Sequence, residues 1–295
     1  MKNTLFKGAG VALVTPMHSD GSINYEKLKE LVDFQIDNGT DAIIAVGTTG
    51  EASTLSVKEH MSAIEATIKY ADGRVPVIAG TGSNDTMSAI EYSKEAARMG
   101  ADGLLSITPY YNKTSQAGLI AHFTKIADNV DCPIILYNVP SRTGTAFKSE
   151  TYAVLADHEN IVGIKEANSN LSMMAHTIAL CGDKVDIYSG NDDEVLPCLS
   201  LGGSGVISVL SNVAPRAVHD MCYDYFEGRL ESARQIQLKY VDLIAALFSD
   251  VSPIPVKEAM NMMGFDVGEC RLPLVRMSEE GRKNLMNELR KVELI

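Results

Sequence analysis

Short apolar segments recur along the chain, with starts roughly 20 to 34 residues apart, about the length of a strand plus the helix that follows it. Most are almost continuously apolar, as is typical of strands covered on both faces of a parallel sheet. The segments comprise residues 10–14, 42–46, 75–79, 103–107, 134–137, 161–164, 185–188 and 205–209. We therefore expect strands at these positions.

Amphipathic helical patterns lie between these segments. Residues 25–38 carry an apolar stripe and are followed by Gly39, a common helix C-cap, and residues 85–99 are followed by Gly100 in the same way. This alternation predicts an α/β fold, a parallel (β/α)8 TIM barrel. A doubly wound open sheet, the structural alternative, usually has a Gly-rich turn after its first strand, whereas residues 15–18 are Thr-Pro-Met-His.

Beyond the last strand segment the pattern is only helical. We expect residues 1–228 to form a barrel domain and residues 229–295 to form a small C-terminal helical region, packed on the barrel or on a neighbouring chain. A chain of 295 residues can bury a large core without disulfides or metals.

Composition and charge disfavour several kinds of partner. Asp and Glu number 38 against 26 Lys and Arg, and the formal net charge of -12 argues against nucleic acid or anionic membranes as partners. Five cysteines without C-x-x-C spacing and six scattered histidines indicate reduced thiols and no metal site. Because the chain has neither a secretion signal nor an apolar run of about 18 residues, we expect a cytoplasmic protein.

Lys165 is the most informative candidate for chemistry. It extends an apolar strand segment, and in a TIM barrel the functional groups gather at the carboxyl ends of the strands. Burial lowers the pKa of a lysine and leaves a neutral amine able to form a Schiff base with a carbonyl compound. The alternative is an exposed or ion-paired lysine. Glu166 is an unsuitable partner because adjacent strand residues face opposite sides.

Other polar residues follow the neighbouring strands. Thr48 and Thr49 lie between glycines in a turn that could hold a carboxylate, or could only cap the next helix. Tyr137 could transfer protons or be a structural tyrosine. Arg142 could bind a second carboxylate or be a solvated loop residue. Tyr110 and Tyr111 together could equally form part of an interface.

Three motifs at these strand ends resemble the dihydrodipicolinate synthase / N-acetylneuraminate lyase family of class I pyruvate-dependent aldolases. They are G-T-T-G-E at residues 47–51, Y-N-V-P-S-R-T-G at 137–144 and G-I-K-E-A at 163–167, and the resemblance extends over essentially the whole chain. Arg142 together with Thr48 and Thr49 is similar to members that condense pyruvate with L-aspartate 4-semialdehyde. That lyase reaction is the first committed step of the diaminopimelate route to lysine.

The resemblance implies a role for each site residue. Lys165 would form the Schiff base with pyruvate, and Tyr137 would be the acid and base for its protons. Thr49 would link Tyr137 to Tyr111, which reaches in from a neighbouring subunit of a homotetramer built as a dimer of dimers. Thr48 and the backbone amides of Thr48 and Thr49 would hold the carboxylate of pyruvate, and Arg142 would bind that of the semialdehyde. The backbones of Gly190 and Ile207 would line the pyruvate pocket. No cofactor is implied.

The family's lysine-feedback site is matched only in part. Residues at or resembling the expected positions are Ala52, Ser53, His60, Asn84 and Tyr110. Val57 and Ser88 replace residues that are polar or acidic in lysine-sensitive members. We therefore expect inhibition by lysine to be weak or absent.

Alternative functions remain at this point. A sugar-acid aldolase of the same fold would also form a pyruvate imine, and a non-catalytic barrel could bind a small acid as a sensor. A barrel that uses pyridoxal phosphate is disfavoured, because Gly202–Gly205 precedes the last strand and lies at the wrong end for a phosphate-binding loop.

Overall fold

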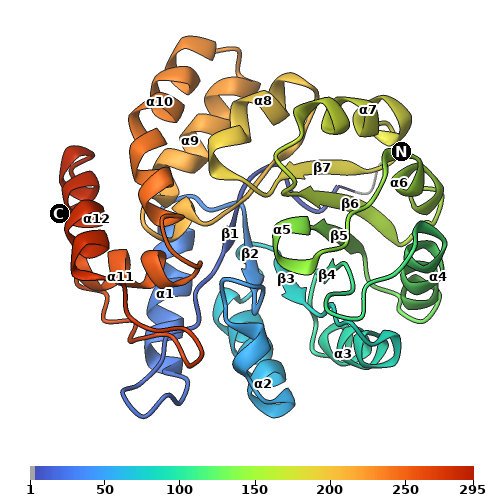
Figure 1. The fold of residues 1–295 in the computed structure, drawn as a ribbon, viewed down its shortest axis with the longest axis horizontal. Helices are drawn as coiled ribbons and strands as arrows, with labels where there is room; N and C mark the ends of the chain where they lie inside the picture. The colour runs from blue at the N-terminus through green and yellow to red at the C-terminus, as the bar shows by residue number, and fades with distance from the viewer. Residues whose placement is uncertain (1–3) are drawn as a thin grey trace.

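The computed structural model describes residues 4–295, and within this range eight parallel strands close into a barrel in sequence order. Figure 1 shows the helices arranged around them. The TIM barrel prediction is confirmed. The strands are β1 (Gly8–Ala12), β2 (Ala42–Ala45), β3 (Val77–Gly80), β4 (Gly103–Ile107), β5 (Ile134–Asn138), β6 (Ile161–Glu166), β7 (Asp186–Ser189) and β8 (Gly205–Ser208).

Helices follow the strands as the sequence pattern predicts. Those around the barrel are α1 (Tyr25–Asp37), α2 (Val57–Ala71), α3 (Thr86–Arg98), α4 (Gln116–Ala127), α6 (Ser149–Leu155), α7 (Leu171–Cys181), α8 (Val195–Ser200) and α9 (Pro215–Phe226). Shorter turns of helix are α5 (Pro140–Thr143), η1 (Ala52–Thr54), η2 (Asp192–Glu194) and η3 (Leu210–Asn212). No helix among residues 4–295 has the length and apolar character needed to cross a membrane.

The first strand begins and ends earlier than its apolar segment suggests. Residues 10–14 were expected, whereas β1 ends at Ala12. Leu13 and Val14 stay buried after the strand, and the Val14 N–H donates to the Asn212 side chain at 3.1 Å instead of to a neighbouring strand. A run of hydrophobic residues indicates which positions are buried. It does not indicate where the hydrogen bonds between neighbouring strands end.

Side chains inside the barrel form their own core, separate from the core between strands and helices. At the amino end of the strands, Phe6 stacks on Tyr188 with ring centroids 4.4 Å apart. The Tyr188 hydroxyl donates to the Phe6 carbonyl at 2.8 Å. These rings fill one end of the barrel, which leaves the carboxyl ends of the strands for a site.

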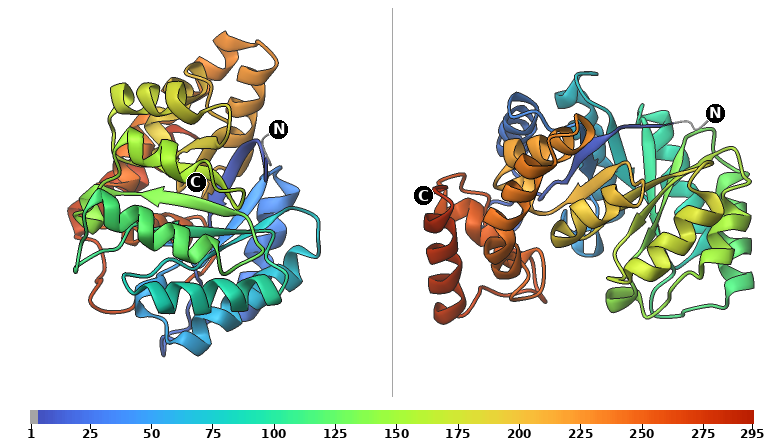
Figure 2. Two further views of the ribbon diagram at one scale, coloured as in Figure 1. Left: turned by 90° about the vertical axis from the view of Figure 1, so that its right-hand side faces the viewer. Right: turned by 90° about the horizontal axis from the view of Figure 1, so that it is seen from above.

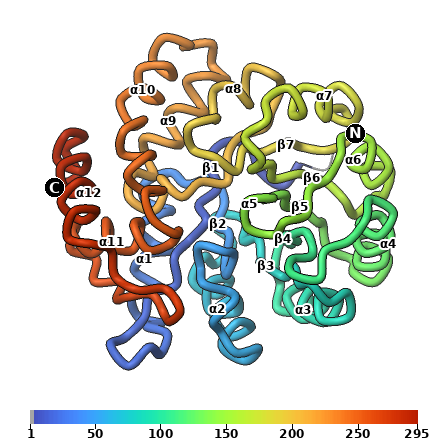
Figure 3. Tube along the Cα trace, in the orientation of Figure 1, coloured from blue at the N-terminus to red at the C-terminus, as the bar shows by residue number. Residues whose placement is uncertain are grey.

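The C-terminal region consists of α10 (Leu230–Leu247), α11 (Ile254–Met262) and α12 (Glu279–Lys291). Figure 2 shows α11 and α12 at one end of the molecule, away from α4 and α6. Figure 3 shows the chain around α11 running beside α1, and the rings of Phe34 and Phe265 meet there at 4.7 Å. The expected division between residues 228 and 229 falls between α9 and α10 and stays a prediction.

Candidate active site

Lys165 lies near the carboxyl end of β6 and points into the barrel. It pairs in register with Tyr137 of β5, its side chain is almost buried, and its Nζ lies 4.3 Å from the centroid of the Tyr137 ring. Burial lowers the pKa of Lys165 to about 7, opposed by the negative charge of Asp192 and assisted by the positive charge of Arg142. A large share of the amine is therefore uncharged near neutral pH and able to attack a carbonyl carbon.

Glu166, the next residue of β6, faces the opposite side of the strand. Its carboxylate accepts hydrogen bonds from the Tyr152 hydroxyl at 2.9 Å, from Asn138 Nδ2 at 2.9 Å and from the Asn168 N–H at 3.1 Å. Burial raises the pKa of Glu166 to about 7. Strand alternation thus separates Lys165 from the nearest carboxylate in the sequence, as expected from the residues alone.

Tyr137 presents a protonated hydroxyl at the same end of the barrel. Burial raises the pKa of Tyr137, while the positive charge of Arg142 and a hydrogen bond with the Thr48 side chain act against the shift. The family resemblance implied that Thr49 makes the hydrogen bond to Tyr137. In the structure the hydrogen-bond partner of Tyr137 is Thr48 instead. The two adjacent side chains point in different directions: Thr48 lines the cavity, whereas Thr49 is buried.

The turn that carries both threonines, residues 47–51, is called here the threonine turn. It follows Val46, whose φ of 53° is unusual for a β-branched residue, and it ends at Glu51, whose φ is 58°. The Thr15 hydroxyl donates to the Gly50 carbonyl at 2.7 Å. The turn therefore has a tightly determined backbone at the mouth of the barrel.

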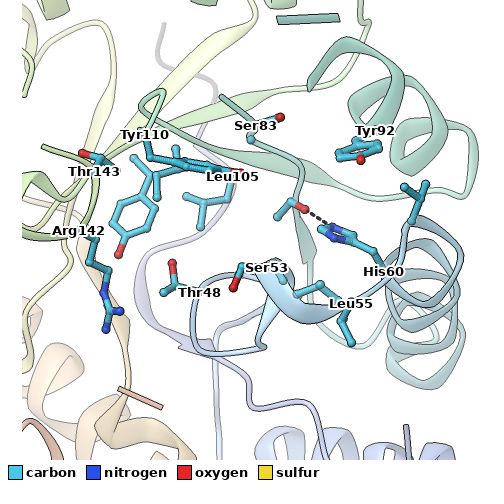
Figure 4. A pocket seen from close by; sticks show the side chains of 18 residues that line it. Thr48, Ser53, Leu55, His60, Ser83, Tyr92, Leu105, Tyr110, Arg142 and Thr143 are labelled. Carbon is cyan, nitrogen blue, oxygen red and sulfur yellow. Dashed lines mark hydrogen bonds between the residues drawn. The ribbon is translucent and has the colours of Figure 1, made fainter. Parts of the chain in front are cut away.

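Arg142 belongs to the short helix α5, directly after β5. Its Nη2 donates to the carbonyl of Ser252, in the C-terminal region, at 3.2 Å. In Figure 4 Arg142 and Thr48 lie on the same side of the cavity. A guanidinium and a hydroxyl-bearing turn at one opening are suited to bind carboxylates.

The cavity has a volume of about 460 Å³ and extends well beyond Thr48 and Arg142. Of the expected lysine-feedback residues, those that line it are Ala52, Ser53, His60 and Tyr110. Asn84 is not among the lining residues, and Ser83 takes its place; the Asn84 carbonyl accepts a hydrogen bond from Asn112. His60 Nε2 lies 2.7 Å from the Gly80 carbonyl, and burial lowers the pKa of His60.

Gly190 and Ile207 both lie beside the inner face of the barrel. The Gly190 N–H donates to the Glu166 carbonyl at 2.7 Å, and a methyl group added at Gly190 would lie 3.2 Å from Lys165 Cε. Ile207 is fully buried in the core inside the barrel with Tyr137. Glycine at position 190 therefore keeps the space next to the lysine side chain open.

Tyr111 points away from its own cavity. Its side chain is 92% exposed, and its φ of 68° turns the backbone sharply between β4 and α4. Its neighbour Tyr110 does line the cavity. Within one chain the structure does not bring Tyr111 to Tyr137.

Asp192 is a buried carboxylate that the sequence reasoning did not assign to the site. It accepts hydrogen bonds from the Ser208 hydroxyl at 2.5 Å and from the N–H groups of Val209 and Leu210, both at 3.0 Å. Its charge acts on Lys165, and burial raises the pKa of Asp192. The only signal was its place after β7, where it is indistinguishable from Asp193.

Among residues 4–295 there is no group of three or more His, Cys, Asp or Glu side chains that could hold a metal ion. Burial raises the pKa of Cys132 to about 11 and that of Cys198 to about 12. These thiols are therefore poor nucleophiles at neutral pH.

The chain is similar to known proteins over almost its whole length. It is 54% identical over 292 residues to a 4-hydroxy-tetrahydrodipicolinate synthase of Lachnoclostridium phytofermentans, covering 99% of both chains. Two solved structures each match with a TM-score of 0.97, covering 99% of this chain and 100% of theirs. One is the chloride-inhibited dihydrodipicolinate synthase of Acinetobacter baumannii complexed with pyruvate, 43% identical, and the other is the Cyanidioschyzon merolae enzyme with lysine bound, 39% identical.

A family model described as the dihydrodipicolinate synthetase family matches residues 5–292. The match spans the barrel and the C-terminal helices alike. The chain belongs to this family.

Proposed function

We propose that the protein condenses pyruvate with L-aspartate 4-semialdehyde to give 4-hydroxy-tetrahydrodipicolinate, the first committed step of the diaminopimelate route to lysine. The observation that carries this proposal is the buried Lys165, whose pKa is lowered to about 7 beside Tyr137. Full-length similarity to synthases of this name, and the pyruvate complex of the Acinetobacter baumannii enzyme, support it.

The first stage is the formation of an imine. The neutral Lys165 amine attacks the keto carbon of pyruvate, and the resulting carbinolamine loses water to leave a protonated imine on Nζ. The threonine turn holds the pyruvate carboxylate through the Thr48 side chain and the backbone N–H groups of Thr48 and Thr49. Tyr137, whose raised pKa keeps it protonated, donates the proton that the departing water requires.

The second stage makes the carbon–carbon bond. The iminium withdraws electrons, so a methyl proton of the bound pyruvate passes to the Tyr137 phenolate left by the first stage, and an enamine forms. The enamine carbon attacks the aldehyde carbon of the semialdehyde, whose carboxylate is held by Arg142. The amino group of the semialdehyde then displaces Lys165 and closes the ring. Fixing both carboxylates supplies much of the rate through positioning, and no cofactor is needed.

The exposure of Tyr111 supports an assembly in which the active site is shared between subunits. We infer a homotetramer, a dimer of dimers, in which Tyr111 of one chain reaches the Tyr137 and Thr48 of its neighbour. A residue that is 92% exposed with a fixed backbone turn is suited to insertion into a partner. A cytoplasmic location is part of the same proposal, since the substrates are metabolites.

Weak or absent inhibition by lysine is a further part of the proposal. The part of the cavity lined by Ser53, His60 and Tyr110 is the region expected for the effector. Val57 is 57% exposed and Ser88 supplies no charge for an amino group. Strong inhibition at sub-millimolar lysine in a coupled assay would contradict this part alone.

Borohydride reduction tests the central step. Incubation with pyruvate and borohydride should add one reduced pyruvate to the chain, located by peptide mass spectrometry on Lys165. The Lys165→Arg variant should give no adduct and lose at least about 1000-fold in kcat. The exposed Lys184→Arg variant is the matched control and should behave as the wild type. An unmodified Lys165 would favour a non-catalytic sensor.

The second substrate is tested with Arg142→Ala. This variant should keep its borohydride adduct with pyruvate and lose turnover with aspartate semialdehyde. Full activity of the variant with the semialdehyde would refute the role of Arg142. A wild-type enzyme that traps pyruvate but turns over only sugar acids would identify the aldolase alternative.

A further inference from the structure

Glu51, the last residue of the threonine turn, is bound by the C-terminal region. Its side chain is 1% exposed, and its Oε1 forms an ion pair with Lys257 Nζ at 2.8 Å. Its Oε2 accepts the backbone N–H of Arg271 at 2.8 Å. Both carboxylate oxygens are therefore occupied by groups more than 200 positions away in the sequence.

Lys257 connects three separate segments through one ammonium group. Besides Glu51, it donates to the carbonyls of Thr15 at 3.2 Å and Glu269 at 2.7 Å. Thr15 follows β1 and in turn donates its hydroxyl to Gly50, inside the threonine turn. Lys257 lies on α11, so this helix contacts the turn directly through Glu51 and indirectly through Thr15.

The backbone of the threonine turn needs such support. Val46 and Glu51, on either side of it, have φ values of 53° and 58°. A non-glycine residue in this region costs about 1–3 kcal/mol and persists only where the surroundings impose it. At Glu51 the backbone bonds only within its own segment, to the Thr48 carbonyl and from the Thr54 N–H, whereas the side chain is held by the distant C-terminal region.

The same C-terminal region also contacts Arg142. The carbonyl that accepts from Arg142 belongs to Ser252, two residues before α11 begins. The groups proposed for the two carboxylates, the threonine turn and Arg142, are thus both supported by residues 252–271. Their common support is not evident from the barrel alone.

We propose that Glu51 and Lys257 are positioning residues that fix the threonine turn for the pyruvate carboxylate. The C-terminal region is accordingly part of the active-site architecture and not only a packing element. The inference rests on the proposed function in that pyruvate is the ligand by which it is measured. The alternative is an ordinary buried ion pair, which would contribute to folding without effect on the site.

The experiment compares Glu51→Gln/Lys257→Met with the wild type. Removing both charges leaves no unpaired ion in the interior, so the free energy of unfolding should recover relative to the single variants. The KM for pyruvate should nevertheless rise about tenfold, with a smaller change in kcat, because the turn loses its anchor. A wild-type KM for pyruvate in this double variant would overturn the proposal.

Two further variants keep the test decisive if the double variant does not fold. Glu51→Asp retains the charge but shortens the reach, and it should raise the KM for pyruvate while it destabilises the fold less than Glu51→Gln does. Glu59→Gln removes the other carboxylate that holds Arg271, at 2.5 Å on α2, and should leave this KM unchanged. An unchanged KM in Glu51→Asp, or an equal rise in Glu59→Gln, would refute positioning. A wild-type enzyme that traps no pyruvate would refute the proposed function instead.

Discussion

Lys165 and Lys257 are both almost completely buried, at 5% and 1% exposure, but they have different surroundings. The ammonium of Lys257 meets one carboxylate and two carbonyls. Lys165 faces the ring of Tyr137, and among residues 4–295 no acceptor lies within hydrogen-bond distance of its Nζ. The acceptors around Lys257 compensate for its lost hydration, so this buried lysine stays charged and holds the segments it contacts together. Burial without such acceptors drives the amine towards its neutral, nucleophilic form.

This difference in surroundings gives the two lysines different roles: Lys257 contributes to stability and Lys165 to activity. The partners of Lys257 offset its desolvation, whereas the desolvation of Lys165 is left largely uncompensated and opposes folding whenever the amine is protonated. Strained or destabilised groups of this kind are expected where a site must react. The comparison can be tested with matched substitutions at the two positions.

The largest expected effect is on the free energy of unfolding, which should fall when Lys257 is replaced by Met and rise when Lys165 is replaced by Met. Lys257→Met leaves Glu51 as an unpaired buried charge and should lose about 3–5 kcal/mol of unfolding free energy. Lys165→Met removes a penalty and should gain about 2–4 kcal/mol at pH 7, with complete loss of activity. Urea denaturation followed by circular dichroism measures both. Losses of similar size in the two variants would contradict the comparison.

The second effect is a pH dependence of stability that belongs to Lys165. Its folded-state pKa of about 7 lies below the ordinary value of 10.5, so between these values the unfolded chain holds a proton that the folded chain has released. Stability should therefore rise from pH 7 towards pH 10.5, by as much as about 4 kcal/mol. Lys165→Met should lack this rise. A rise of the same size in that variant would assign it to other groups.

The smallest effect sharpens the role of the charge near Lys165. Asp192→Asn removes a negative charge that raises the pKa of Lys165, so this pKa should fall further. In a plot of the rate of imine formation against pH, the rise on the acid side should then move to a pH lower by about one unit. Borohydride trapping at a series of pH values measures the rate. Asp193→Asn, at the adjacent exposed position, is the matched control. Equal shifts in both variants would rule out a specific action of Asp192.

The opposite directions of Lys165 and Glu166 were predictable because they follow from strand alternation. A lysine that ends an apolar strand must point into or above the barrel, and the next residue, Glu166, must point outward. Local sequence could not decide between neighbours of the same type. Thr48 and Thr49, or Asp192 and Asp193, differ only in the direction that the turn gives each side chain.

The sequence by itself determined the barrel, since the spacing of its apolar segments allows few other folds, and it singled out Lys165, Tyr137 and Arg142 as candidates through their places at or just after the strand ends. The tertiary structure decided which buried charges are paired. Glu51 meets Lys257, 206 positions away, whereas Lys165 forms no ion pair with a carboxylate among residues 4–295. The physical reason is that desolvation and hydrogen bonding depend on groups brought together by packing, and a pattern along the chain carries no record of those distances.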